Sequence, residues 1–263
     1  MSNREVVPSR VRSRRGFLRM AVAAVSTAVV AGCDKIGAMP WFAGLLETGE
    51  TLTQATQRWI VGPDSRAQEF TEADVARPFR SNGTSRPRSA EYDALAANAF
   101  LDWRLQVDGL VAQAMRFSLA ELKALPSRTQ ITRHDCVEGW SAIGKWTGVP
   151  LHEVLTRVQP DAKARYVVFH CADPMQPNGL QPYYERIDMV DAYHPQTILA
   201  YGLNDAALPI GNGAPLRVRV ERQLGYKMAK YLMRIELVER FDDLHGGNGG
   251  YWEDRGYAWY AGI

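Results

Sequence analysis

The chain has 263 residues and a formal net charge of +2, so it carries no basic field that would favour nucleic acid as a partner. Hydrophobic residues make up 46% of the sequence and charged residues 23%, as in ordinary globular proteins with a substantial core. This composition predicts one mature domain. It does not indicate the function, which has to be inferred from local motifs.

The N-terminus joins a basic run to a short apolar run, AVAAVSTAVVAG. The apolar run is shorter than the roughly 20 residues that a membrane-spanning helix needs. Residues 13–19, SRRGFLR, fit a twin-arginine export signal, which is read as an address by a receptor. We therefore expect residues 1–33 to be a signal and the mature protein to work outside the cytoplasm, in the periplasm.

The apolar run ends in Val30, Ala31, Gly32 and Cys33, which resembles a lipobox. In that interpretation Cys33 is diacylated and becomes the new N-terminus, and two acyl chains give a stable membrane tether. The alternative is an ordinary signal that is cut near Ala31, with Cys33 incidental.

Residues 34–74 are expected to form a helical lead-in, since apolar residues recur at near-helical spacing until Gly62 and Pro63. Residues 74–87 are rich in Arg, Ser, Asn, Gly and Pro, which is typical of a loop. This loop is either a surface linker or, because of its three arginines, an anion-binding loop.

Short strands and short helices follow, without a repeated βαβ period, so we predict an α+β fold. Ser118 and Glu121 have the spacing of a capping box, which opens a short helix. The expected strands are 101–111, 127–136, 164–172, a strand within 197–209 that ends in an Asn-Asp turn, and two strands within 214–240; the expected helices are 117–126 and 151–159, and the proline-rich segment 173–187 is expected to be a loop.

Cys136 ends one expected strand in a polar, Gly- and Trp-rich stretch. It could be a nucleophile with His134 as its base, a buried apolar residue, half of a disulfide with Cys171, or a metal ligand. Glu138 is a weaker candidate for a general acid or base. The sequence contains no CxxC pair and no Cys/His cluster, so a zinc site, an iron–sulfur cluster or a c-type haem has no ligand set.

The stretch around Cys136, TRHDCVEGWSAIGKWTGVPLHEVL, resembles the molybdopterin-binding domain of the sulfite oxidase family. The resemblance continues in order through YVVFHC, LAYGLNDAALPIGNGAPLRVRV and LGYKMAKYLMRIELVER. It covers roughly residues 75–263. It implies a single oxidoreductase domain of mixed β-sheets with short helices, which binds a mononuclear molybdenum-molybdopterin cofactor.

The resemblance also implies roles for individual residues. Cys136 would ligate molybdenum through a soft thiolate, and Arg133 and His134 would take part in catalysis by favouring that thiolate. Cys171 stands where the family has a threonine contact, and a thiol is a weaker donor than a hydroxyl. The cofactor contacts implied with Cys136 are Cys171, Asn212, Arg217, Met228, Ala229 and Lys230, and more loosely Arg80, Ser81 and Asn82.

The family resemblance further implies oxygen-atom transfer, with electrons exchanged with a membrane b-type cytochrome or another carrier. Similarity to haem-less periplasmic members favours reduction of S-oxides or N-oxides, including methionine sulfoxide in small molecules or proteins. A sulfite-oxidising dehydrogenase and a non-catalytic scaffold lipoprotein are the alternatives. The aromatic tail, residues 246–263, is either a flap that closes the core or the rim of a substrate funnel.

Overall fold

The computed structural model describes residues 40–175 and 182–263. The predicted export signal and Cys33 lie outside these residues. The chain divides into two compact units, Met1–Ala55 and Thr56–Ile263, and helix α2 (Pro40–Val61) runs through the boundary. Of the helices in the described ranges, none is both long and apolar enough to cross a membrane. The fold below is that of the second unit.

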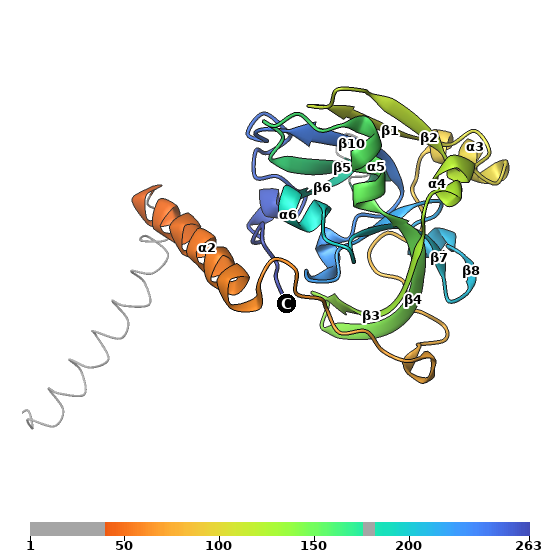
Figure 1. Cartoon of the computed structure of the whole chain (residues 1–263), viewed down its shortest axis with the longest axis horizontal. Coiled ribbons are helices and arrows are strands. Elements are labelled where there is room, and N and C mark those ends of the chain that lie inside the picture. The colour runs from red at the N-terminus through yellow and green to blue at the C-terminus, as the bar shows by residue number, and fades with distance from the viewer. Residues whose placement is uncertain (1–39, 176–181) are drawn as a thin grey trace, which may run out of the picture. The chain divides into compact units, whose positions relative to one another are not determined.

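Two five-stranded sheets form the second unit (Figure 1). In the first sheet β1 and β10 run parallel, whereas the other neighbours are antiparallel, so this sheet is mixed. Its strands, in spatial order, are β2 (Met115–Ser118), β1 (Arg104–Gly109), β10 (Leu232–Val238), β5 (Tyr166–Pro174) and β6 (Pro182–Asp188).

The second sheet is antiparallel and is built on a long, curved hairpin of β3 and β4 (Figure 1). Its strands are β3 (Arg128–Cys136), β4 (Trp140–Pro150), β7 (Ile198–Leu203) and β8 (Ala206–Ala207), with β9 (Arg217–Arg219) paired to β7. The described helices are short: α3 (Ala90–Ala97), α4 (Leu119–Ala124), α5 (Leu151–Val158) and α6 (Met189–Ala192), with 3-10 turns η1 (Glu72–Asp74), η2 (Ile210–Asn212), η3 (Gly225–Lys227) and η4 (Glu253–Arg255).

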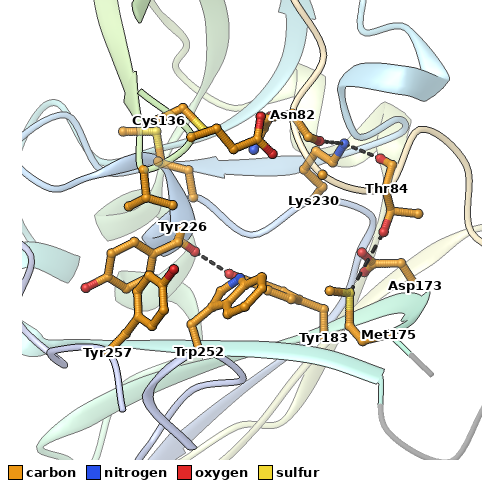
Figure 2. Close-up of a pocket in the computed structure, with 15 residues that line it drawn as sticks. Asn82, Thr84, Cys136, Asp173, Met175, Tyr183, Tyr226, Lys230, Trp252 and Tyr257 are labelled. Atoms are coloured by element: carbon orange, nitrogen blue, oxygen red, sulfur yellow. Dashed lines mark hydrogen bonds between the residues drawn. The ribbon is translucent and has the colours of Figure 1, made fainter. Parts of the chain in front are cut away.

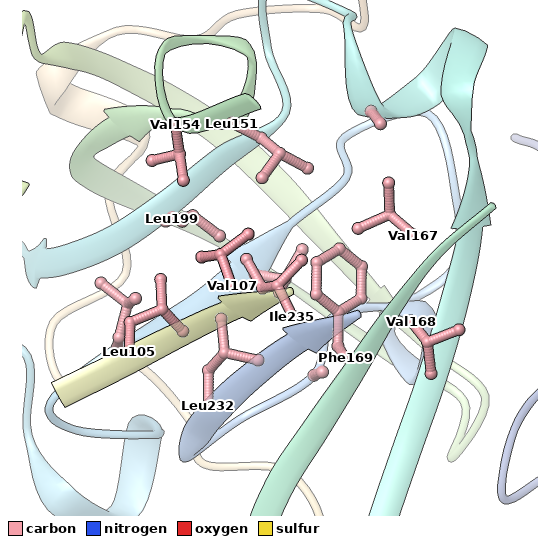
Figure 3. Packing of buried hydrophobic residues seen from close by; sticks show 14 of the residues in the cluster. Leu105, Val107, Leu151, Val154, Val167, Val168, Phe169, Leu199, Leu232 and Ile235 are labelled. Atoms are coloured by element: carbon pink, nitrogen blue, oxygen red, sulfur yellow. The ribbon is translucent and has the colours of Figure 1, made fainter. Parts of the chain in front are cut away.

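The main hydrophobic core forms where apolar faces of both sheets meet helix α5 (Figure 3). Leu151, Val154, Leu155 and Val158 are all buried, which is the i, i+3, i+4, i+7 stripe of an amphipathic helix. Strands contribute Leu105, Val107, Val167, Phe169, Leu199, Leu232 and Ile235, which have no exposed surface.

The observed elements confirm the predicted α+β class and several local signals. Ser118 and Glu121 make both hydrogen bonds of a capping box at the start of α4. Asn204 and Asp205 form the turn between β7 and β8 with φ of +52 and +65, and both residue types tolerate this left-handed backbone.

One expectation about the chain between the motifs is corrected, and further elements appear where none was predicted. The expected loop 173–187 ends in strand β6, where Pro182 occupies the first position, which needs no ladder N–H. Strand β4 and helix α3 were not anticipated from the sequence. Glycines are uncommon in strands, so the sequence of β4 does not read as a strand. Gly144 is needed there because another residue packs closely: a Cβ on Gly144 would lie 2.9 Å from the Phe79 ring.

Candidate active site

Cys136 is the last residue of β3 and pairs with Trp140, the first residue of β4. Within the connecting turn, the Gly139 N–H donates to the Cys136 carbonyl oxygen at 3.0 Å, and Gly139 has a φ of +82 that suits a residue without a Cβ. The tight hairpin holds the partly exposed Cys136 on the wall of a cavity (Figure 2).

The cavity has a volume of about 210 Å³ and gathers residues from both sheets and from the C-terminal segment. In Figure 2 aromatic side chains lie along one side of it, and Asn82 and Lys230 lie on the other. Its lining residues are Asn82, Gly83, Thr84, Cys136, Val137, Glu138, Asp173, Met175, Tyr183, Gly225, Tyr226, Met228, Lys230, Trp252 and Tyr257.

The thiol of Cys136 favours its neutral form. Burial raises the pKa of Cys136, and the nearby Glu138 adds to the rise, whereas a main-chain hydrogen bond and the charge of Arg80 lower it. Arg133 is exposed and pairs with Asp135 at 2.9 Å. No contact in the described part of the chain links Arg133 to the thiol, so its effect on the thiolate stays a prediction. A bound cation beside the thiol would be needed to deprotonate it at neutral pH.

His134 is fully buried two residues before Cys136. The Arg219 guanidinium lies 2.9 Å from Nδ1 of His134, and because arginine only donates, Nδ1 is the acceptor and Nε2 carries the proton. Burial, followed by the charges of Arg219, Arg217 and Lys230, lowers the pKa of His134 well below its usual range. His134 is thus a neutral ring, so the expectation that its charge favours the thiolate is wrong.

Gly225 lies against the unpartnered Nε2 of His134, where the structure leaves room only for a hydrogen atom. A Cβ on Gly225 would come within 2.5 Å of both Cε1 and Nε2 of the ring. We predict that Gly225→Ala lowers the free energy of unfolding by about 1–3 kcal/mol, because the ring is packed on all sides and cannot retreat. Urea unfolding measures this.

Gly211→Ala is the matched control for that substitution. The nearest atom to a Cβ on Gly211 is the Ser81 hydroxyl oxygen at 3.6 Å, which is an ordinary contact. We expect a change of less than about 0.5 kcal/mol. Equal losses in the two variants would contradict the tight contact at Gly225.

Lys230 ties the loop that contains Asn82 and Thr84 to the cavity. Its Nζ donates to the carbonyl oxygens of Asn82 at 2.7 Å, Gly211 at 2.9 Å and Thr84. No carboxylate lies within ion-pair distance of this ammonium among the described residues, and burial lowers its pKa to about 7, helped by the charge of Arg217. When it is protonated, Lys230 is a buried cation without a carboxylate partner among the described residues.

Arg217 on β9 is a second such cation behind the cavity wall. It is fully buried and donates to the carbonyl oxygens of Asn212 at 3.0 Å and Met228 at 3.2 Å. Burial, followed by the charge of Arg219, lowers the pKa of Arg217 to about 9. Nε of Arg217 and Nδ2 of Asn212 are buried donors without a partner in the described part of the chain.

These observations test whether the site suits an anionic cofactor. Two buried cations whose nearest partners are neutral carbonyls, together with unpartnered N–H donors, match a ligand that brings a phosphate and several acceptors. A lone thiol at the wall of the same cavity matches a soft metal. The residues present therefore fit a molybdopterin that carries a metal.

The predicted site residues fall into three groups: those that line the cavity, those that are buried without lining it, and those that lie elsewhere. Cys136, Asn82, Met228 and Lys230 line the cavity. A second group is buried without lining it: His134, Asn212, Arg217, Ala229 and Cys171. Arg133, Arg80 and Ser81 do not line it either; Arg80 stacks on Trp140 at 4.6 Å, and the Ser81 hydroxyl donates to the Gly211 carbonyl.

Cys171 packs in the main core and is a free thiol, as is Cys136, so the disulfide alternative is wrong. Burial raises the pKa of Cys171 well above its usual range, which keeps it neutral.

Sequence reasoning missed Asp173, Met175 and Tyr183 as cavity residues. All three fall in the segment 173–187, which was expected to be a loop, and nothing local shows that Asp173 is buried. Trp252 and Tyr257 of the aromatic tail do line the cavity, as the substrate-funnel interpretation of that tail requires.

A thiol and buried basic side chains without carboxylate partners around one cavity are the features expected of a protein that binds an anionic, metal-bearing cofactor. The family model described as oxidoreductase molybdopterin binding domain matches residues 93–245. The chain belongs to this family, and it is a molybdopterin-dependent oxidoreductase of the sulfite oxidase type, as the sequence resemblance predicted.

Alignments with named relatives cover most of the chain. A provisionally named protein-methionine-sulfoxide reductase subunit YedZ1 of Azospira oryzae is 37% identical over 95% of this chain and 88% of its own length. The protein-methionine-sulfoxide reductase catalytic subunit MsrP of Xanthomonas axonopodis is 35% identical over 88% of this chain and 72% of its own length. The solved sulfane dehydrogenase SoxCD of Paracoccus pantotrophus gives a TM-score of 0.48 at 20% identity, over 53% of this chain and 39% of that chain.

Proposed function

We propose that this oxidoreductase binds a mononuclear molybdenum cofactor and reduces S-oxides or N-oxides, with methionine sulfoxide, free or in proteins, as the first candidate substrate. The observation that carries this proposal is the charge of the cavity lining. Lys230 is the only cation among the described lining residues, whereas Glu138 and Asp173 are acids. Because Lys230 is assigned to the cofactor, the described lining has no cation left to bind a sulfite anion, whereas a neutral sulfoxide needs none.

The uncharged part of the lining suits the apolar substituents on the sulfur of a sulfoxide. Tyr183, Trp252 and Tyr257 present aromatic surface, and Met175 and Met228 present thioethers. Aromatic and thioether groups make favourable contacts with methyl and methylene groups and exclude water. The two relatives named as protein-methionine-sulfoxide reductase subunits support the same substrate class.

When bound, the cofactor supplies oxygen-atom transfer and a two-electron redox centre. The residues of this chain hold and orient it: Cys136 offers the thiolate ligand, and Arg217 and Lys230 offer positive charge and N–H donors to its anionic groups. Sulfoxide reduction breaks the S–O bond, adds two electrons to sulfur and joins the oxygen with two protons to form water. The side chains around the cavity shape which S-oxide enters.

The electrons must come from a partner protein. We propose a membrane b-type cytochrome, with another electron carrier as the alternative, and a periplasmic enzyme that is exported by the twin-arginine route. The sequence of residues 13–19 and the lipobox at Cys33 support this location, since a diacylated Cys33 would hold the enzyme beside a membrane donor.

The enzymatic test compares two substrates on one preparation. The full chain is purified from a host that makes molybdopterin, and turnover is measured with methionine sulfoxide and a reduced viologen dye, and with sulfite and a ferricyanide acceptor. We expect methionine sulfoxide to have the larger kcat/KM by at least about tenfold, which corresponds to about 1.4 kcal/mol of transition-state stabilisation. Turnover of sulfite alone would support the sulfite-oxidising alternative.

A scaffold lipoprotein, the remaining alternative, makes a different prediction for the same preparation. Such a protein would contain neither molybdenum nor pterin. Metal analysis by mass spectrometry and fluorescence of the oxidised pterin therefore separate it from either enzyme.

A further inference from the structure

A buried group of three charged side chains lies beside the aromatic side of the cavity. Lys227 of η3 donates to Oε1 of Glu185 on β6 and to Oε1 of Glu253 in η4, and the three side chains have at most 1% of their surface exposed. A Cβ on Gly250 would lie 2.0 Å from Oε2 of Glu253 and 2.8 Å from Oε1 of Glu185, so this glycine closes one side of the group to water. We call these three residues the Lys227 triad.

The charges of the Lys227 triad balance only if it holds one proton. One ammonium faces two carboxyl groups, and Oε2 of each receives no N–H or O–H from the described part of the chain. Burial raises the pKa of Glu185 well above its usual range. The charge of Lys227 opposes this rise in pKa, whereas the charge of Glu253 and a hydrogen bond between the two carboxyl groups add to it. A proton shared by the two acids leaves one negative charge opposite Lys227.

Every member of the triad is close in the chain to an aromatic residue of the cavity lining. These aromatic residues are Tyr183, two positions before Glu185; Tyr226, directly before Lys227; and Trp252, directly before Glu253. The Tyr183 hydroxyl donates to the Tyr226 carbonyl oxygen (Figure 2). The triad therefore joins the three elements that carry the aromatic side of the cavity.

Glu253 belongs to the turn that supplies the C-terminal part of this aromatic side. The Tyr257 N–H donates to the Trp252 carbonyl oxygen at 3.1 Å, and the centroids of the two rings are 5.2 Å apart, so the turn presents both rings together. The Tyr257 ring also packs edge-on against Tyr226, with 5.4 Å between centroids. The Glu253 side chain bonds to the buried ammonium of Lys227. This buried contact helps to fix where both rings stand.

We propose that Glu253 is a positioning residue, which acts through the Lys227 triad to hold the Trp252 and Tyr257 rings against the apolar substituents of an S-oxide substrate. This inference rests on the proposed function. It adds a residue that does not itself line the cavity. A loosened turn would remove apolar contact from the substrate without touching Cys136, so we expect an effect on substrate affinity rather than on the turnover of bound substrate.

The test compares Glu253→Ala and Glu253→Gln in the full chain, purified from a host that makes molybdopterin. We expect Glu253→Ala to raise KM for methionine sulfoxide about tenfold and to leave kcat within about twofold, since contact with one methylene group in a pocket is worth roughly that factor in specificity. Glu253→Gln keeps an oxygen for Lys227 and leaves Glu185 to balance the charge, so its KM should stay within about twofold of the wild-type value. Both variants should hold wild-type amounts of molybdenum and pterin.

Hydrogen exchange, followed by mass spectrometry on the same preparations, gives a readout that does not depend on activity. The amides of residues 253–257 are expected to exchange at least about tenfold faster in Glu253→Ala than in the wild type, because the turn loses its buried contact. The exposed Glu239→Ala is the matched control and should match the wild type in exchange and in KM. If Glu253→Ala fails to fold, Glu253→Asp replaces it, with an expected rise in KM of about threefold because the shorter side chain displaces the turn.

The possible contrary results are distinguishable. A wild-type KM in Glu253→Ala, or in Glu253→Asp where that variant replaces it, would overturn the inference. An equal rise of KM in Glu253→Gln would do so too, since glutamine keeps the contact on which the inference depends. Loss of molybdenum and pterin from Glu253→Ala would show that the triad supports the cofactor site instead. If the wild type holds the cofactor but turns over no S-oxide, the proposed function fails, and this inference fails with it.

Discussion

Cys136→Ala is expected to lose at least about 100-fold in activity and nearly all of its molybdenum. Residues that only support a metal ligand cost about 10–100-fold when they are removed, and Cys136 is the thiol that the β3–β4 hairpin places on the cavity wall. Metal analysis by mass spectrometry and turnover of methionine sulfoxide measure the two losses. Far-UV circular dichroism should be unchanged, because the side chain is only partly buried.

Cys171→Ala is the matched comparison, since it removes the other described thiol. Cys171 is buried in the hydrophobic core, and burial keeps its pKa well above the usual range, so it remains a neutral thiol. We expect this variant to keep most of its molybdenum and to lose stability instead. Molybdenum loss from Cys171→Ala with retention in Cys136→Ala would reverse the assignment of the metal ligand.

Glu221→Ala is expected to lower the free energy of unfolding by about 3–5 kcal/mol. Glu221 accepts two hydrogen bonds from Arg219, at 2.9 and 2.6 Å, and one from Gln130 at 2.8 Å, and the side chains of Arg219 and Glu221 have no exposed surface. Removing the carboxylate leaves a buried guanidinium uncompensated. It also frees the arginine that fixes His134. Urea unfolding monitored by tryptophan fluorescence measures the loss.

Glu153→Ala breaks a solvent-exposed ion pair, rather than a buried one, and serves as the control. The Glu153 and Arg157 side chains are 27% and 35% exposed and lie four residues apart on helix α5. Such pairs contribute about 0.5 kcal/mol or less. A loss below about 1 kcal/mol in Glu221→Ala, no larger than in this control, would show that the buried pair does not support the fold.

Much of the architecture follows from short-range sequence signals. The Ser118 capping box, the Asn204–Asp205 turn and the apolar stripe of 151–158 each occur where the sequence predicted them. Local hydrogen bonding and backbone sterics act over a few residues, so a single sequence is sufficient to show them. Strand β4 was not predicted because its glycines are required by distant partners: a Cβ on Gly148, for example, would collide with the carbonyl oxygen of Leu199 on β7.

The sequence by itself determined the molybdopterin family, the α+β class and Cys136 as the candidate metal ligand, because these depend on motif order and residue type. Only the tertiary structure decided the charge state of the site. His134 is neutral because it is buried and because Arg219, 85 residues away, donates to it, and Oδ1 of Asp173 has no partner among the described residues while Lys230 bonds to carbonyl oxygens of other loops. Desolvation and partner choice arise from residues that are distant in the chain, so no local pattern can encode them.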